Sequence, residues 1–205
     1  IKNVCIFVKL NLNQIFSLMK KIIFLSFLFI TTVSVWAQNT ITVCPSGCDY
    51  ASIQTAIFSA ADGDLILVGP GHYEEGGYNS PGQGTSIVTS GLIFGVESNL
   101  PHYNYNVAPN LTLRSTHGAS QTVIDATGNA DAVRIFPNAG VITIDGFTFV
   151  GFDSRGITNG MASWQGNELH IINNRVINAS GALLANGNGI QVSSDNSVVK
   201  GNFVE

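Results

Sequence analysis

The period of the apolar residues changes near residue 64. In the preceding stretch, DYASIQTAIFSAADGD (49–64), four apolar residues recur at the i, i+3, i+4 and i+7 spacing of one helix face: Ile53, Ala56, Ile57 and Ala60. Asp49 is suited to cap the start of such a helix, and Gly63 is suited to end it. The pattern therefore predicts one short amphipathic helix at this point.

Beyond residue 64 the helical period is replaced by short apolar runs between Gly, Asn, Asp and Ser. The first run, Leu65–Val68, ends at the turn sequence Gly69-Pro70-Gly71. Further runs occupy 111–113, 123–124, 133–135, 141–144, 147–150, 169–172, 176–177, 190–192, 198–199 and 203–204. Apolar runs of this length bounded by turn residues predict buried strands.

Three of these segments can be superposed: VITIDGFTF (141–149), LHIINNRVI (169–177) and SVVKGNFVE (197–205). Phe149, Val176 and Val204 are then equivalent, at intervals of 27 and 28 residues. A repeat of this length, built of strands and turns, is typical of a β-solenoid. Residues at a shared place in each unit (Gly146, Asn174 and Asn202) fit turn positions with left-handed backbone angles, which Gly and Asn tolerate best.

The predicted helix has a role in this architecture. The first coil of a solenoid leaves an open apolar end and a row of unpaired strand groups. An amphipathic helix directly before the first strand can cover that end. We therefore expect Ile53, Ala56, Ile57 and Ala60 to pack on the first coil, with Leu65–Val68 as its first strand.

The beginning of the chain resembles a secretory signal. Lys20 and Lys21 follow the first methionine, Met19, and an apolar stretch (22–35) then leads to the small-residue site Val35-Trp36-Ala37. The alternative, a transmembrane anchor, needs about 20 apolar residues. We expect residues 1–18 to lie outside the translated protein, 19–37 to be a signal peptide, and the protein to be secreted or on the cell surface. The chain begins with Ile1 and stops within a strand-like run, so we expect 38–205 to be part of a longer protein.

Net charge restricts the partners of residues 38–205. This part holds all 13 acidic residues and, after the loss of four lysines, 5 of the 9 basic ones, which gives −8. Such a chain without a basic stripe is a poor candidate for nucleic acid or anionic membranes.

Cys44 and Cys48, in CPSGC, are the cysteines of this part. An exported protein favours a disulfide between them. The alternative, half of a zinc site, lacks the further His or Cys ligands that a tetrahedral shell requires.

The segment ITVCPSGCDYASIQTAIFSAADGDLILVGPGHYEE, followed by LTLRSTHGASQTVIDA, closely resembles the start of right-handed parallel β-helix proteins of the pectin-lyase-like superfamily. The resemblance covers about 41–205 and implies an all-β right-handed parallel β-helix with a short N-terminal capping helix. It also implies association with polysaccharide. The superfamily includes lyases, hydrolases, esterases and non-catalytic surface proteins, and a shared fold does not choose among them.

The resemblance allows each activity to be tested against the residues. Lyases of the superfamily hold Ca²⁺ with several acidic residues and use a Lys or Arg as base, and the only close acid–base pair in the coils is Asp153 with Arg155. A turn aspartate beside a solvated arginine is the other interpretation. Hydrolases need two carboxylates at one bond, and the polygalacturonase signatures are absent. Adjacent Glu74 and Glu75 would point to opposite faces of a strand. No cofactor is evident, and Ca²⁺ would be expected if the full-length protein is a lyase.

A stretch of 35 residues, 76–110, interrupts the pattern of the superfamily. Long loops in compact domains are often functional. Tyr103 and Tyr105 present flat apolar rings that could stack on sugars or pack against the coils.

Two hypotheses follow. In the first, the chain is the front part of a secreted lyase-like or hydrolase-like protein that acts on polysaccharide, with its catalytic residues mostly downstream. In the second, it is a non-catalytic surface or adhesin-like solenoid.

Overall fold

The computed structural model describes residues 11–13, 15–21, 38–81, 87–95, 110–136, 139–159, 167–177 and 188–205. The chain divides into two compact units, Ile1–Ala37 and Gln38–Glu205. Residues 15–21 of the first unit are helical, and most of the predicted signal segment lies outside the described residues. No helix within the described ranges is long and apolar enough to cross a membrane.

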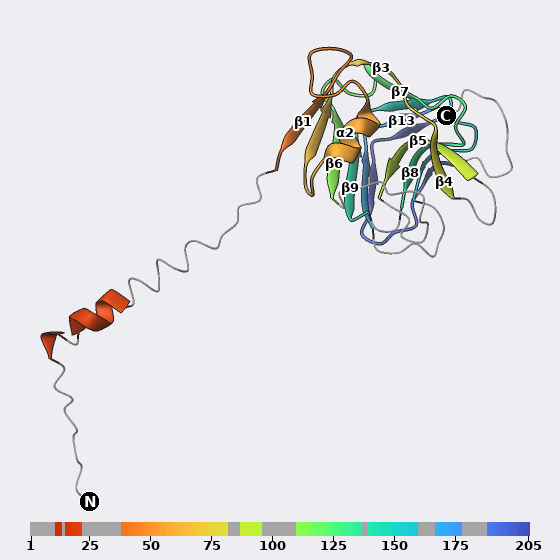
Figure 1. The fold of residues 1–205 in the computed structure, drawn as a ribbon. Helices are drawn as coiled ribbons and strands as arrows, with labels where there is room; N and C mark the ends of the chain where they lie inside the picture. Colours follow the sequence, from red (N-terminus) through yellow and green to blue (C-terminus); the bar gives the residue numbers. More distant parts are fainter. Residues whose placement is uncertain are drawn as a thin grey trace, which may run out of the picture. The chain divides into compact units, whose positions relative to one another are not determined.

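Three β-sheets form the described part of the second unit (Figure 1). Sheet A has the order β1 (Thr40–Val43), β2 (Leu65–Val68), β6 (Leu111–Ser115), β9 (Val141–Asp145), β12 (Glu168–Ile172), β15 (Val198–Lys200). Sheet B has the order β3 (Gly71–Glu74), β7 (Thr122–Asp125), β10 (Thr148–Val150), β13 (Arg175–Val176), β16 (Phe203–Val204). Sheet C has the order β4 (Tyr78–Pro81), β5 (Ile87–Phe94), β8 (Asp131–Ile135), β11 (Arg155–Thr158), β14 (Asn188–Gln191).

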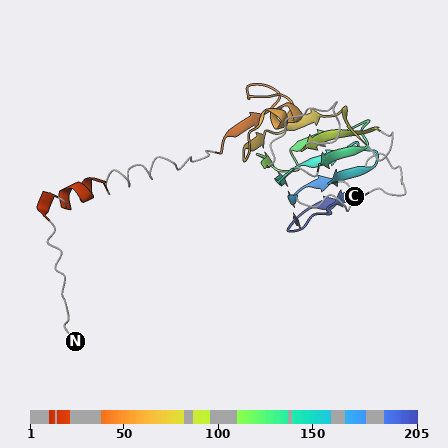
Figure 2. The ribbon, with the colours of Figure 1, turned by 60° about the horizontal axis from the view of Figure 1, so that its bottom comes forward.

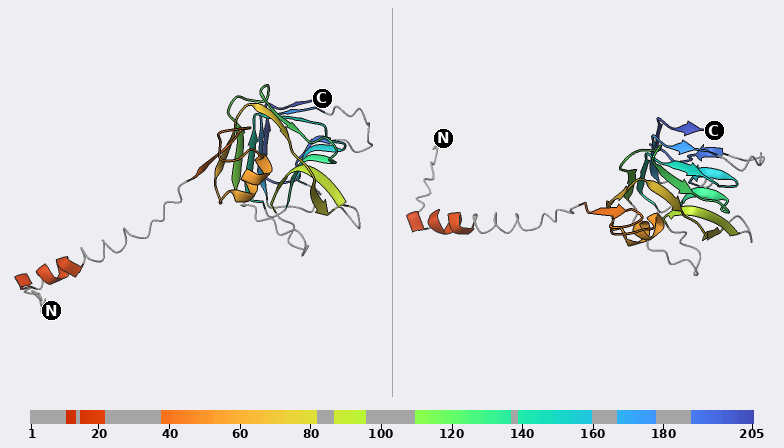
Figure 3. Two further views of the ribbon diagram at one scale, coloured as in Figure 1. Left: turned by 45° about the horizontal axis from the view of Figure 1, so that its top comes forward. Right: turned by 90° about the horizontal axis from the view of Figure 1, so that it is seen from above.

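The chain visits the three sheets in turn and returns to sheet A one strand further along. Coil 1 contains β2, β3 and β5; coil 2 contains β6, β7 and β8; coils 3 and 4 repeat the order, and β15 and β16 begin coil 5. Figures 2 and 3 show the coils stacked from the orange N-terminal end of this unit to its blue C-terminal end. Of the strand pairs in the described ranges, only β4 with β5 is antiparallel. The predicted all-β class with parallel sheets is confirmed.

The core consists of columns of side chains, because in-register parallel strands place equivalent residues directly above one another. In sheet A one inward-facing column is Ile41, Ile66, Leu113, Ile144, Ile171 and, at its half-exposed end, Val199. In sheet B it is Tyr73, Ile124, Phe149, Val176 and Val204. The predicted equivalence of the last three residues of that column is confirmed. Burying these columns against one another supplies the apolar contacts that hold the three sheets together.

The turn between sheets A and B partly corrects the sequence prediction. Gly146 has the expected positive φ of 84°, but its equivalents in the next two coils are Asn173 (54°) and Gly201 (68°) rather than Asn174 and Asn202. The two predicted asparagines serve hydrogen bonding instead. Asn174 donates to Ile144 O and its Oδ1 accepts from Phe147 N, while Asn202 bonds Asn174 in the same way one coil on. The buried amide of Asn174 and the half-buried amide of Asn202 thus satisfy peptide groups at the turns.

The helix α2 (Ile53–Ser59) is shorter than predicted at both ends. Its N-cap is Ser52, whose Oγ accepts from Thr55 N at 3.3 Å. Asp49 is not the cap because its Oδ2 accepts from both the N and the Oγ1 of Thr42 in β1, at 2.8 and 2.7 Å. The chain leaves the helix in an extended conformation at Ala60, before Gly63 is reached.

The apolar stripe of α2 faces the core at the start of the coils. Ile53, Ala56 and Ile57 are fully buried, Ala60 is nearly so, and the helix contacts β1, β2 and β5. Gln54 is also fully buried, and its amide bonds both peptide groups of Ile93: Nε2 donates to the carbonyl (3.0 Å), and Oε1 accepts from the N–H (2.7 Å). The Gln54 side chain thus makes the two hydrogen bonds that a neighbouring strand would otherwise make with the edge of β5.

Two further features of the first coil bear on the predictions. Cys44 and Cys48 are joined by a disulfide directly after β1. The segment 76–110 is not one long loop, because it contains β4 and β5, and β5 is the sheet C strand of coil 1. Within β5, a Cβ on Gly91 would lie 2.7 Å from Ala132 O, so the close approach of coils 1 and 2 requires glycine.

Candidate functional site

The expected pair of Asp153 and Arg155 does not form. Arg155 donates instead to Asp131 of the preceding coil, from Nε to Oδ1 at 2.8 Å and from Nη2 to Oδ2 at 3.2 Å. The two residues are in-register neighbours in β11 and β8, which brings their side chains together. Asp153 is exposed, and its backbone N–H donates to Asn129 O. The interpretation of Arg155 as a solvated arginine is also wrong, because its side chain is only 22% exposed.

A second arginine shares the same carboxylate. Arg134 donates from Nε and Nη2 to Asp131 Oδ2, and both side chains are buried. Ser90 occupies the in-register position of Asp131 in coil 1, and its buried Oγ has no partner among the described residues. Breaking the buried pair of Arg134 and Asp131 would leave an uncompensated charge. We assign this group to the stability of coils 1 to 3, since Asp131 and Arg134 are buried and Arg155 is mostly covered.

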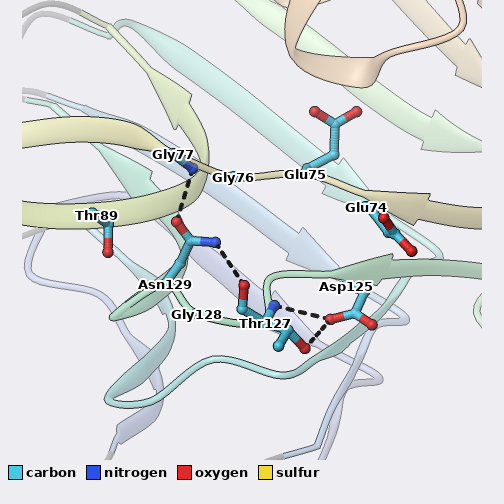
Figure 4. Close-up of a pocket in the computed structure, with 9 residues that line it drawn as sticks. All are labelled: Glu74, Glu75, Gly76, Gly77, Thr89, Asp125, Thr127, Gly128 and Asn129. Atoms are coloured by element: carbon cyan, nitrogen blue, oxygen red, sulfur yellow. Dashed lines mark hydrogen bonds between the residues drawn. The ribbon is translucent and has the colours of Figure 1, made fainter.

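An open pocket of about 560 Å³ lies where the connections from sheet B to sheet C of coils 1 and 2 run side by side (Figure 4). Its lining consists of glycines and residues with polar side chains: Glu74, Glu75, Gly76, Gly77, Thr89, Asp125, Thr127, Gly128 and Asn129. All of these residues belong to the described part of the chain, and they come from β3, β5, β7 and the turns that follow β3 and β7.

Two carboxylates share one side of the pocket. Glu74 in β3 and Asp125 in β7 are in-register neighbours, and paired strands lie about 4.8 Å apart. Glu74 is exposed, whereas Glu75 is buried and accepts from Ile53 N and Ser52 Oγ at the start of α2. The two glutamates point to opposite faces, as predicted, and Figure 4 shows Glu74 beside Asp125 with Glu75 directed away from both. The acid pair of this site is therefore formed between coils.

Asp125 is held in place through both of its oxygens. Oδ1 accepts from the N and Oγ1 of Thr127, at 2.9 and 2.6 Å, and Oδ2 lies 3.1 Å from His72 Nε2. Partial burial raises the pKa of Asp125, but the hydrogen bonds from Thr127 and the contact with His72 outweigh it, so the pKa lies below its ordinary value. Asp125 is therefore ionised at neutral pH.

Asn129 forms the floor of the pocket. Its Oδ1 accepts from Gly77 N at 3.0 Å, and its Nδ2 donates to Ala126 O at 3.1 Å. A side chain on Gly76 would overlap the Asn129 amide, so glycine is required there. The amide thus fixes the turn of coil 1 against the turn of coil 2.

The sequence reasoning missed this site because Glu74 and Asp125 are 51 residues apart. The signal that could have found it is the superposition of GHYEE (71–75) on TVIDA (122–126), which aligns the two acids. This superposition is not evident in the sequence because the strands β4 and β5 lengthen the first coil.

Tyr103 and Tyr105 lie outside the described residues. His170 pairs with Glu168, and His117 contacts Thr116. Among the residues with described positions, no three His, Cys, Asp or Glu side chains are grouped so that they could hold a metal ion.

The chain matches no protein-family model, no curated protein and no solved structure. The geometry itself defines a class of site: an open, polar, acceptor-rich pocket on the outside of an all-β protein of parallel sheets.

Proposed function

We propose that the chain is a right-handed parallel β-helix of the pectin-lyase-like type, exported from the cell, and that it binds polysaccharide through the pocket of Glu74 and Asp125. The observation that carries the binding role is this open pocket, whose lining consists of carboxylate, amide, hydroxyl and glycine backbone groups.

The handedness is supported by a general rule. Each strand of sheet A, for example β6, is followed by a crossover through sheets B and C to its parallel neighbour, β9. Connections between parallel neighbours in one sheet are right-handed in about 98% of cases. The repeated path through three sheets therefore favours a right-handed helix of coils.

The volume and chemistry of the pocket support a sugar ligand. Ligand pockets range over about 300–1,000 Å³, and about 560 Å³ leaves room for a small number of sugar rings. None of its nine lining residues is aromatic or a large aliphatic residue. A ligand with many hydroxyl groups meets this lining best, because each hydroxyl can donate to the exposed oxygens. The disulfide and the signal-like segment support export.

Binding is favoured over catalysis at this pocket. Hydrolysis of a glycosidic bond needs one carboxyl group as acid and a second as base or nucleophile. Both oxygens of Asp125 are already bonded, which leaves Glu74 as the open carboxylate. This arrangement favours the non-catalytic, adhesin-like alternative for residues 38–205, and a lyase or hydrolase activity would require residues outside the described part.

The test is a glycan array probed with the full-length protein, its Glu74→Ala variant and the matched control Glu168→Ala, which removes a half-exposed acid from β12. We expect the wild type and the control to bind the same glycans, and Glu74→Ala to bind them at least a few-fold more weakly. Equal binding by Glu74→Ala would remove the pocket from the proposal. A wild-type protein that binds no glycan would refute the proposed function itself.

A further inference from the structure

We propose that the pocket of Glu74 and Asp125 selects sugars with a free amino group over sugars with a carboxylate. This inference rests on the proposed function, because it names the class of sugar for the same pocket. The glucosamine unit of a deacetylated polysaccharide has the required chemistry, namely an ammonium group among hydroxyls.

The first argument concerns hydrogen-bond donors. Two lining side chains use their donors within the protein: Thr127 Oγ1 donates to Asp125, and Asn129 Nδ2 donates to Ala126 O and Thr127 O. Thr89 Oγ1 accepts from Ala130 N at 3.3 Å and keeps its own hydroxyl hydrogen. The N–H of Gly77 donates to Asn129 Oδ1. The open carboxylate of Glu74 remains as an acceptor, and Asp125 Oδ2, which has one contact, with His72, can accept a further bond. The lining therefore offers more acceptors than side-chain donors, which suits a ligand that brings donors, and an ammonium group brings three.

The second argument concerns charge. Neither Lys nor Arg lines the pocket. The His72 imidazole is not part of the lining, and its Nε2 lies 3.1 Å from Asp125 Oδ2. Arg114 in β6 is paired with Asp145. Residues 38–205 carry 13 acidic and 5 basic residues, so the surrounding field is also negative. A uronate would meet like charge here, whereas an ammonium would meet opposite charge.

The third argument concerns fixed geometry. Thr127 and His72 hold the carboxylate of Asp125 in one orientation, and Asn129 holds the two turns together. A carboxylate that is already oriented does not have to be ordered when the ligand arrives, which favours binding. Glu74 lies beside it in the same register, so one ammonium group can contact both side chains.

The experiment uses titration calorimetry on the full-length protein with three probes of equal chain length: glucosamine oligomers, N-acetylglucosamine oligomers and galacturonate oligomers. We expect the glucosamine oligomer to bind most tightly and the galacturonate oligomer most weakly. An exposed ion pair corresponds to roughly two- to fivefold in affinity, so Glu74→Gln should reduce the preference for the free amine by about that factor. The matched control Glu168→Gln should leave the preference unchanged, and added salt should weaken it.

The outcomes separate the inference from the function on which it rests. Equal affinity for the free and acetylated oligomers, unchanged in Glu74→Gln, would overturn the inference and leave the proposed function standing. Tighter binding of the galacturonate oligomer would also overturn it. Binding of none of the three, together with an empty glycan array, would refute the proposed function. Glu74 is exposed, so its variants should fold as the wild type does, and a circular dichroism spectrum checks this.

Discussion

Replacing Gln54 by Met tests whether α2 stabilises the first coil through hydrogen bonds as well as apolar contact. Methionine has nearly the volume of glutamine and is a good helix former, so packing and helix propensity change little. The variant removes the two bonds between the Gln54 amide and the peptide groups of Ile93. Ile93 is 1% exposed, so water cannot replace them.

The expected loss follows from the two peptide groups left behind. A buried donor or acceptor without a partner costs about 1–3 kcal/mol, and the variant creates one of each, for about 2–6 kcal/mol. Burying a thioether rather than an amide offsets part of this loss. We therefore expect the free energy of unfolding to fall by roughly 2–4 kcal/mol.

Urea unfolding followed by circular dichroism measures this change, and the slope against denaturant should stay constant if the folded state is unaltered. Hydrogen exchange should show that the Ile93 amide loses protection. The control is Gln121→Met, at an exposed residue that uses only backbone hydrogen bonds, and it should change stability by less than about 0.5 kcal/mol. If Gln54→Met behaves like this control and the Ile93 amide stays protected, the argument is wrong.

Three other substitutions test separate parts of the structure. Asp131→Asn should lower the free energy of unfolding by about 3–5 kcal/mol, because it leaves Arg134 and Arg155 without their counter-charge. The control Asp153→Asn, at an exposed turn, should change the free energy of unfolding little in the same denaturation assay. Burial raises the pKa of Glu75 despite its hydrogen bonds to the start of α2, so the folded state binds the Glu75 proton more tightly than the unfolded state does. The free energy of unfolding should therefore fall as pH rises from the ordinary glutamate pKa to the raised one. A Glu75→Gln variant whose stability depends on pH as the wild type's does would contradict this. Ile57→Asp places a charge in the core and should lift α2 and cause aggregation, which light scattering detects.

The repeat could be predicted from the sequence because apolar, inward-facing residues recur in it at a nearly constant interval. Phe149, Val176 and Val204 are apolar at intervals of 27 and 28 residues, and each packs into the same column. The ends of α2 could not be predicted so well. Asp49 has the chemistry of a helix cap, but a strand 7 residues earlier offers Thr42 as a better partner, and that competition is visible only once β1 is placed.

The pocket shows why function is harder to infer than fold in this architecture. A column of core residues can be recognised in the sequence from apolar character at a fixed interval, whereas an acid pair can be recognised only when the register between two coils is known. Glu74 meets Asp125 only because β4 and the long strand β5 complete the first coil between them. The run of β5 is broken in the sequence by Ser90 and Gly91, and the glycine is needed where coils 1 and 2 approach most closely. Gly91, which makes the strand hard to recognise in the sequence, is thus also the residue that lets coil 1 pack closely on coil 2. That close packing places Glu74 beside Asp125.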